Sequence, residues 1–211
     1  FYAHSSSPFV DKEWSEEEVF TYRKKLNSIW NLVHKMAKSE GEELTVDDYL
    51  RSKYNRLIKK YRELMDDHEI RKGANVAFYD IPSEIDWYFK RGGRNEELLK
   101  RIGKEWIKMM APFTPHISEE LSQLWDIEYV NKEELPAVNE DEISNTAEAE
   151  EDYIKDTRDD IRQILDVADV EGDKIYLYTA PEWKEDALQK ILQNPDAGMG
   201  IMSTLVKEVD A

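Results

Sequence analysis

The sequence predicts a mainly α-helical protein, an antiparallel helix bundle followed by a small, truncated α/β module. Two observations support the bundle: successive segments repeat apolar residues at three- and four-residue spacing, and short connections rich in Gly and Pro separate them. Short connections between amphipathic helices favour antiparallel packing. A single stretch, residues 174–179, is rich in aromatic and β-branched residues, as is typical of a strand.

The first long helix is expected to begin after Trp14. Ser15-x-x-Glu18 is a capping-box pattern, in which the serine side chain accepts a hydrogen bond from the backbone of the third helical residue. This helix is expected to end near Gly41. The apolar stripe of this helix consists of Val19, Leu26, Ile29, Trp30 and Val33.

A second helix is predicted to begin at Thr45-x-x-Asp48 and to run to Asp66. Its apolar face consists of Leu50, Tyr54, Leu57, Ile58, Tyr61, Leu64 and Met65. Its opposite face is basic and carries Arg51, Lys53, Arg56, Lys59, Lys60 and Arg62.

Proline and glycine divide the next part of the chain. A helical pattern over residues 70–88 contains Pro82, which is expected to kink or split it because proline lacks the backbone N–H and clashes with the preceding turn. The glycine pair at 92–93 then breaks the chain, and a fourth helix is predicted from about Asn95.

After Trp125 the pattern changes. Residues 126–149 are rich in acids and lack an apolar period, which indicates a linker, and a helix resumes at Glu150. A lone strand at 174–179 cannot satisfy its own backbone, so we expect the last module to be truncated. The predicted parts are a connector at 1–14, the bundle at 15–125, the acidic linker at 126–149 and the start of an α/β domain at 150–211.

Composition excludes several classes of protein. The 211 residues include no cysteine, and the four histidines show no metal-ligand spacing, so neither a disulfide framework nor a metal site is expected. No apolar run is long enough to cross a bilayer, and no signal peptide is evident; we expect a cytoplasmic protein without a membrane partner. Because the chain begins at Phe1 rather than Met, we expect it to be a piece of a longer protein.

Charge is unevenly distributed along the chain. Residues 51–108 hold 15 Lys and Arg against 10 Asp and Glu, whereas the rest holds 14 against 36, which together give the net charge of −17. A local basic face is sufficient for RNA because phosphate attraction is screened within roughly 10 Å at moderate salt. Two alternatives remain open: the basic residues merely solvate helix faces, or the chain is an acidic helical module that binds proteins.

One junction carries a family resemblance. In residues 111–121, Ala-Pro-Phe-Thr-Pro-His-Ile-Ser-Glu-Glu-Leu, Pro112 ends one helix and Pro115 fits the first turn of the next. This stretch resembles the junction in the anticodon-binding helix bundle of class I aminoacyl-tRNA synthetases that handle leucine, isoleucine, valine and methionine. One departure is Ser122, where the family often has Trp.

Three further stretches narrow the resemblance. Residues 77–81 and 85–89, Ala-Phe-Tyr-Asp-Ile and Ile-Asp-Trp-Tyr-Phe, look like the third bundle helix of the archaeal and eukaryotic leucyl type. Residues 175–183, Ile-Tyr-Leu-Tyr-Thr-Ala-Pro-Glu-Trp, are similar to the start of the C-terminal domain of that type. A bundle of a valyl, isoleucyl or methionyl enzyme remains the alternative within the family.

The resemblance implies that the whole enzyme joins leucine to its tRNA with ATP and magnesium in protein biosynthesis. It implies for this piece no catalytic residue, no cofactor and no metal, and as partners the leucine tRNA and the rest of the synthetase chain. Basic side chains in such interfaces typically contact the sugar-phosphate backbone. The residues expected to do so are Lys53, Arg56, Lys59, Lys60, Arg91 and Arg94.

Other candidates are interpreted as structural. Residues 35–39, Lys-Met-Ala-Lys-Ser, differ by one residue from the Lys-Met-Ser-Lys-Ser loop of class I synthetases, but they lie at the end of a helix, where lysines favour the negative dipole. No His-Ile-Gly-His counterpart is present. His116 is expected to form a structural hydrogen bond, and four tryptophans are expected to lie in the core: Trp30, Trp87, Trp106 and Trp125.

Overall fold

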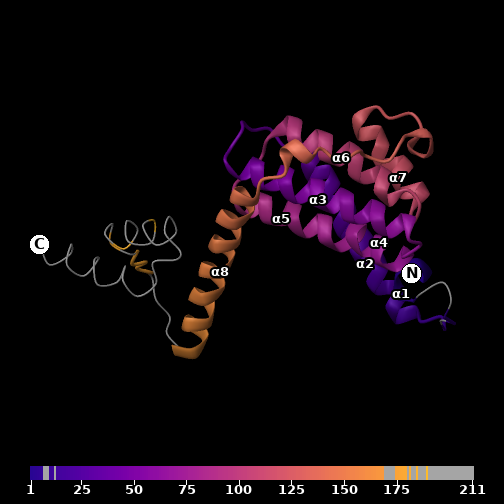
Figure 1. The fold of residues 1–211 in the computed structure, drawn as a ribbon. Coiled ribbons are helices and arrows are strands. Elements are labelled where there is room, and N and C mark those ends of the chain that lie inside the picture. The colour runs from indigo at the N-terminus through magenta and orange to yellow at the C-terminus, as the bar shows by residue number, and fades with distance from the viewer. Residues whose placement is uncertain are drawn as a thin grey trace, which may run out of the picture. The chain divides into compact units, whose positions relative to one another are not determined.

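A computed structural model describes residues 1–6, 10, 11, 13–168, 174–179, 181, 184 and 189 of the chain. It divides into two compact units, Phe1–Asp160 and Ile161–Ala211. The first unit is a bundle of helices, so the predicted mainly α-helical fold is confirmed (Figure 1). The division into parts 1–14, 15–125, 126–149 and 150–211 stays a prediction.

Eight α-helices occur in the described residues, with shorter helical turns between them (Figure 1). The α-helices are α1 (Tyr2–Ser5), α2 (Glu16–Ala37), α3 (Val46–Asp66), α4 (Ile70–Asn75), α5 (Ile81–Lys90), α6 (Glu96–Met110), α7 (Pro115–Ser122) and α8 (Asn145–Ala168). A π-helical turn covers Val76–Asp80, and 3-10 turns cover Gln123–Trp125, Val130–Lys132 and Glu140–Glu142.

Side-chain caps fix the beginnings of two long helices. The Ser15 hydroxyl accepts a hydrogen bond of 3.3 Å from the Glu18 amide, as the capping-box pattern predicts. The Asn95 side chain accepts one of 3.1 Å from the Leu98 amide at the beginning of α6. Thr45 precedes α3 as predicted, although its side chain makes no capping hydrogen bond.

Pro82 splits the third predicted segment. The helix that begins at Ile70 widens into the π-helical turn over Val76–Asp80 and continues as α5, in which Pro82 occupies the first turn. Proline has no amide hydrogen and its ring crowds the carbonyl four residues earlier, so a wider turn at this point avoids the clash. The prediction that Pro82 kinks or splits this segment is confirmed.

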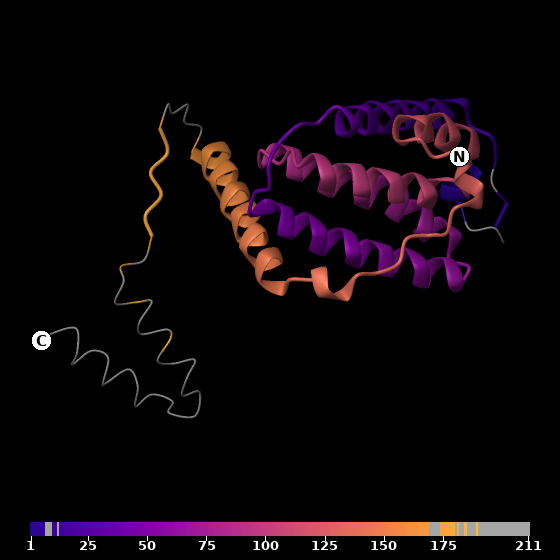
Figure 2. The ribbon, with the colours of Figure 1, turned by 90° about the horizontal axis from the view of Figure 1, so that it is seen from above.

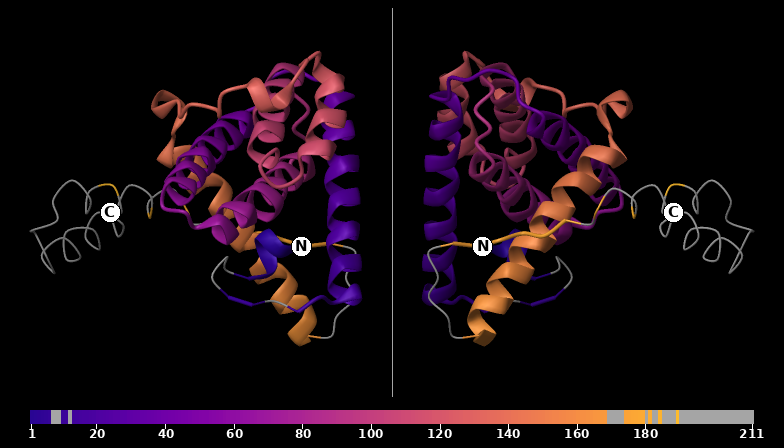
Figure 3. Two further views of the ribbon diagram at one scale, coloured as in Figure 1. Left: turned by 90° about the vertical axis from the view of Figure 1, so that its right-hand side faces the viewer. Right: turned by 90° about the vertical axis from the view of Figure 1, so that its left-hand side faces the viewer.

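Most of the core lies between α2, α3, α5 and α6. Figure 2 shows α3 beside α6, and the side views of Figure 3 show α2 and α3 along opposite sides of the bundle. Trp106 of α6 is fully buried, and its indole Nε1 donates a 2.7 Å hydrogen bond to the Ala77 carbonyl. The Tyr61 hydroxyl likewise donates to the Met109 carbonyl at 2.8 Å. Buried polar groups of this size are stable only when they are paired in this way.

A buried polar cluster joins the ends of α3, α5 and α6. The Asp47 carboxylate is fully buried; its two oxygens accept hydrogen bonds from the Tyr88 hydroxyl at 2.7 Å and the Asn95 amide group at 2.6 Å. The Asn95 backbone N–H donates in turn to the Tyr88 hydroxyl at 3.0 Å. The polar groups of the cluster therefore satisfy one another's hydrogen-bonding capacity, which lets a carboxylate lie inside the bundle.

The corner between α6 and α7 follows the prediction in its backbone. Trp125 packs on α6, where a Cβ atom at Gly103 would lie only 2.2 Å from the indole ring.

Trp87, Trp106 and Trp125 are buried, as expected, but Trp30 has 37% of its surface exposed, so its assignment to the core is wrong. His116 is also exposed and makes no hydrogen bond to a described residue, so its structural interpretation is wrong.

The predicted C-terminal α/β module is not seen in the described residues. Residues 174–179 carry no regular secondary structure and, within the described chain, no strand pairs with them. The helix predicted from Glu150 begins earlier, at Asn145. The predicted helices after Pro181 and Gly200 lie outside the described residues, apart from Pro181, Lys184 and Gln189.

Candidate nucleic-acid interface

The six residues predicted to contact RNA lie on two elements. Lys53, Arg56, Lys59 and Lys60 share the outer face of α3, because residues three or four apart lie on one side of a helix. Arg91 and Arg94 lie in the turn between α5 and α6, where Gly92 adopts a positive φ of 89°. Four of the six residues thus share a face of α3, and their contact with RNA stays a prediction.

An acidic segment covers much of that face. Figure 2 shows the chain between α7 and α8 running alongside α3, and the turn Glu140–Glu142 contacts that helix. We call residues 133–151 the acidic strap. Its five carboxylates that pair with bundle cations belong to Glu133, Glu140, Glu142, Glu148 and Glu151.

Glu148 connects the strap to three residues of α3. Its carboxylate lies 2.5 Å from Arg56 Nε and 3.2 Å from Lys53 Nζ, and it also accepts a hydrogen bond from the Ser52 hydroxyl. Burial acts to raise the pKa of Glu148, but the hydrogen bonds from Ser52, Arg56 and Lys53 together outweigh it and lower that pKa. The charges of Lys53 and Arg56 are therefore compensated by the chain itself.

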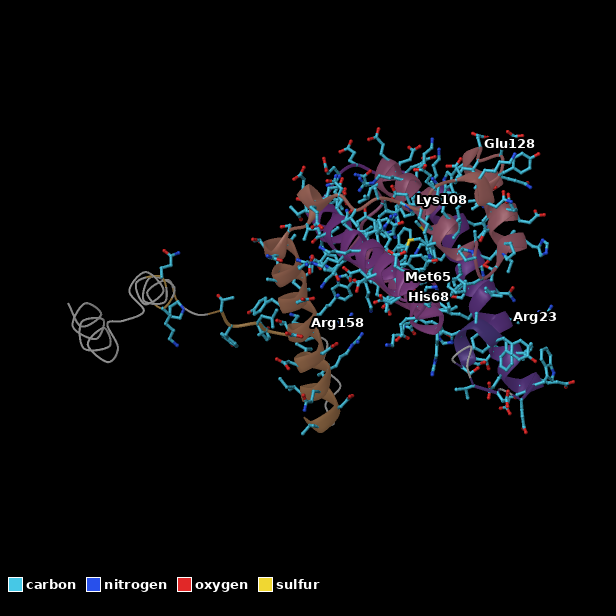
Figure 4. The ribbon with its side chains drawn as sticks, turned by 45° about the vertical axis from the view of Figure 1, so that its right-hand side comes forward. Arg23, Met65, His68, Lys108, Glu128 and Arg158 are labelled. Atoms are coloured by element: carbon cyan, nitrogen blue, oxygen red, sulfur yellow. The ribbon has the colours of Figure 1, made fainter. Side chains whose placement is uncertain are left out.

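Arg91 is held in a similar way by a carboxylate near the beginning of α8. Its Nε lies 2.8 Å from the Glu151 carboxylate, which is buried and also accepts a 3.0 Å hydrogen bond from the Trp87 indole. Arg158, labelled in Figure 4, places its guanidinium 4.7 Å from the centre of the Trp87 ring. Charge pairing and cation–π contact thus fix α8 to α5 up to this residue.

Lys59 and Lys60 are more accessible. Lys59 pairs with Glu140 at 3.0 Å and Lys60 with Asp80 at 2.8 Å, yet 51% and 55% of their side-chain surfaces remain exposed. Lys60 also borders an open depression of about 730 Å³ between α3 and the beginning of α5. Exposed pairs of this kind contribute little stability, so these two ammonium groups exchange partners at low cost.

Arg94 is anchored without a carboxylate. Its guanidinium donates to the carbonyls of Phe89 at 3.1 Å and Gly93 at 2.5 Å, and lies 4.7 Å from the centre of the Phe89 ring. These contacts orient the group and leave its positive charge uncompensated. Of the six predicted residues, Arg94 is the one for which the described chain supplies no acidic partner.

Two further cations, which the sequence did not single out, also bind the strap. Arg101 of α6 makes two hydrogen bonds to Glu142, and Lys108, labelled in Figure 4, pairs with Glu133 at 2.9 Å. The high density of acids at 126–149 was the signal that a complementary basic surface lies nearby, but no local rule says which helix it covers.

The described residues show neither a metal cluster nor a transmembrane helix. No group of three or more His, Asp or Glu side chains within the described ranges is arranged to hold a metal ion. No helix in the same ranges is long and apolar enough to cross a membrane.

The helix bundle belongs to a family of tRNA-ligase domains. Residues 47–177 match the anticodon-binding domain of tRNA ligases, and the chain belongs to this family. The resemblance that the helix junction at 111–121 indicated is thereby confirmed.

Curated relatives of the chain are leucine–tRNA ligases. The chain is 33% identical over 206 residues to leucine–tRNA ligase of Archaeoglobus fulgidus, covering 97% of this chain and 22% of the relative. It is 34% identical over 189 residues to leucine–tRNA ligase of Methanocaldococcus jannaschii, covering 87% and 20%, and 32% identical over 209 residues to that of Pyrococcus furiosus, covering 94% and 22%. The chain thus spans about a fifth of the length of the curated relatives it matches.

Proposed function

We propose that this chain is the tRNA-binding part of a leucine–tRNA ligase. The observation that carries the proposal is the similarity to archaeal leucine–tRNA ligases along nearly the whole chain. The whole enzyme would attach leucine to its tRNA in the cytoplasm with ATP and magnesium, which act outside this piece. Its partners would be the leucine tRNA and the remainder of the synthetase chain.

The six basic residues divide into two groups in this proposal. Lys59 and Lys60 are half exposed, and each has one exposed or half-exposed carboxylate partner that a phosphate oxygen can replace. Arg94 offers an uncompensated charge. Lys53, Arg56 and Arg91 hold the more buried carboxylates of Glu148 and Glu151, so RNA would have to compete with these pairs, although 43% of the Arg56 side-chain surface is exposed.

A salt titration tests the function directly. The 211-residue chain is titrated with leucine tRNA and with an unrelated tRNA at several salt concentrations. Phosphate docking predicts that the logarithm of the affinity falls linearly with the logarithm of salt concentration, by roughly 0.7 to 0.9 per phosphate contact. Absence of binding to either tRNA at the lowest salt concentration would overturn the proposal.

The variants should leave the buried strap carboxylates Glu148 and Glu151 paired. Reversing Lys53 or Arg56 would set a new carboxylate against Glu148 and detach the strap, so the double variant Lys59→Gln/Lys60→Gln is cleaner. The matched control is Lys72→Gln/Lys132→Gln, which removes the same charge from two exposed lysines elsewhere. We expect the first pair to weaken binding and reduce the salt slope by about 1 to 2, and the control to change little.

An acidic protein-interaction module is the second candidate. This function is disfavoured because five carboxylates of the strap, which a basic protein partner would bind, are already paired with cations of the bundle. Such a module would bind no tRNA at any salt concentration.

A further inference from the structure

The end of α2 and the α5–α6 turn form a second basic surface, which includes no residue of α3. An open depression of about 620 Å³ lies between the last turn of α2 and the α5–α6 turn. Its lining consists of Asn31, His34, Lys35, Lys38, Ser39, Glu40 and Arg94. We call these residues together with Trp30 the α2-end site.

Close backbone contact fixes the shape of the α2-end site. Gly41 packs against the α5–α6 turn so tightly that a Cβ atom there would lie 2.6 Å from Arg94 Cβ. The Ser39 hydroxyl donates a 2.8 Å hydrogen bond to the Lys35 carbonyl and so closes the end of α2. The two segments that supply the cations are therefore held together by packing rather than by charge.

Three cations meet at the α2-end site without an acidic partner in the described chain. The ammonium of Lys35 lies 3.8 Å from the centre of the Phe89 ring, and the guanidinium of Arg94 lies 4.7 Å from the same centre. Lys38 makes no ion pair with any described residue, and Glu40 is the sole acid of the lining. Lys35 and Arg94 both bring positive charge to one depression, so an anion bound in that depression would lower the energy.

His34 lines the same depression as these cations, and its ring contacts Trp30, one turn earlier on α2. Trp30, His34 and Lys38 are spaced four residues apart and so follow one face of α2. The His34 ring lies 4.8 Å from the Trp30 ring, and His34 Nδ1 is 2.9 Å from the Trp30 carbonyl. Because a carbonyl only accepts, Nδ1 is the donor, and Nε2 stays available to a ligand.

We infer that the α2-end site binds an unpaired nucleotide of tRNA, with its phosphate on Lys35, Lys38 and Arg94 and its base on the exposed part of the Trp30 indole. Proteins that bind unpaired RNA combine such phosphate contacts with an aromatic platform, because every base has a stacking face. The inference rests on the proposed tRNA-binding function and adds to it a site and the form of RNA that the site takes.

The same site explains residues 35–39, whose pattern resembles a catalytic loop. Lys35 and Lys38 would bind phosphate here as well, but that phosphate belongs to RNA and not to ATP. Their position at the end of α2 favours lysine on its own account, since cations stabilise the negative end of a helix. The exposure of Trp30 has no such local explanation, because exposing an indole to water gains no stability.

The test compares three variants of the 211-residue chain, with leucine tRNA, a single-stranded oligonucleotide and a duplex RNA of equal length as probes. Trp30→Ala should weaken binding of leucine tRNA and of the single strand roughly 5- to 100-fold. Trp30→Phe should restore most of the affinity, since it keeps a stacking ring. Lys35→Gln/Lys38→Gln should reduce the salt slope by about 1.4 to 1.8, and duplex RNA should respond to the lysine change but not to Trp30→Ala.

Matched controls separate this inference from the proposed function. Trp14→Ala removes another exposed indole and should leave all affinities unchanged. If the unaltered chain binds no tRNA, the proposed function itself fails. If it binds tRNA and Lys59→Gln/Lys60→Gln weakens that binding while the α2-end variants do not, the inference fails alone. Displacement of the RNA by poly-glutamate, with no effect of Trp30→Ala, would overturn it in favour of an acidic protein partner.

Discussion

Arg101 on α6 and Glu142 in the acidic strap face each other and form two hydrogen bonds, Nη1–Oε1 at 2.6 Å and Nη2–Oε2 at 2.8 Å. The Glu142 carboxylate also accepts a 2.9 Å hydrogen bond from the Asn55 side chain of α3. One carboxylate thus connects the strap to two helices at once, and its removal reports on how firmly the strap is held.

Glu142→Gln should lower the free energy of unfolding by about 1 kcal/mol, because a bidentate pair is lost but both side chains are partly exposed to solvent. Urea-induced unfolding measures the change. The control is Glu140→Gln, whose partner Lys59 is half exposed, and it should cost under about 0.5 kcal/mol. Equal losses for the two variants would contradict the central role of Glu142.

The contribution of Glu142 should depend on pH. The hydrogen bond from Arg101 is the largest cause that lowers the pKa of Glu142 below its ordinary 4.5, against an opposing effect of burial. A carboxyl with a lowered pKa contributes stability above the unfolded pKa and loses it as pH falls through the folded pKa.

The difference in unfolding free energy between the unaltered chain and Glu142→Gln should therefore stay constant from about pH 7 to about pH 5 and shrink below about pH 4.5. Denaturant titrations across this range measure it. A difference that grows on acidification would show the opposite sign of linkage.

Asp47→Asn should destabilise the bundle by about 2 to 4 kcal/mol. The carboxylate accepts from two donors, Tyr88 and Asn95, whereas an amide has one acceptor oxygen and would turn its NH₂ group toward the second donor. Thermal and urea unfolding measure the loss. Tyr61→Phe is the control, since it removes one buried hydroxyl that donates to the Met109 carbonyl, and should cost about 1 kcal/mol.

Trp106→Ala should cost about 3 to 5 kcal/mol, because a fully buried indole leaves a cavity and the Ala77 carbonyl loses its donor. Trp30→Ala, at a partly exposed position of α2, should change stability by less than about 1 kcal/mol. Circular dichroism during thermal unfolding checks both. Similar losses at the two positions would contradict the assignment of Trp30 to the surface.

Helix positions were predictable because their signals are local. Ser15 and Asn95 cap their helices, Pro82 splits one and the glycine pair at 92–93 ends another, each through the backbone of residues next to it in the chain. The predicted strand at 174–179 did not meet this condition, since a strand requires a partner elsewhere and none lies in the described part of the chain.

The sequence by itself determined the helical class, the helix ends and most of the core, because apolar periodicity and capping act within a few residues. Only the tertiary structure decided which acids meet which bases, since Glu148 and Arg56 are 92 positions apart and their contact depends on where the strap crosses α3. It also decided the exposure of each tryptophan: Trp30 and Trp106 both follow apolar stripes, but Trp106 is fully buried between helices and Trp30 is 37% exposed.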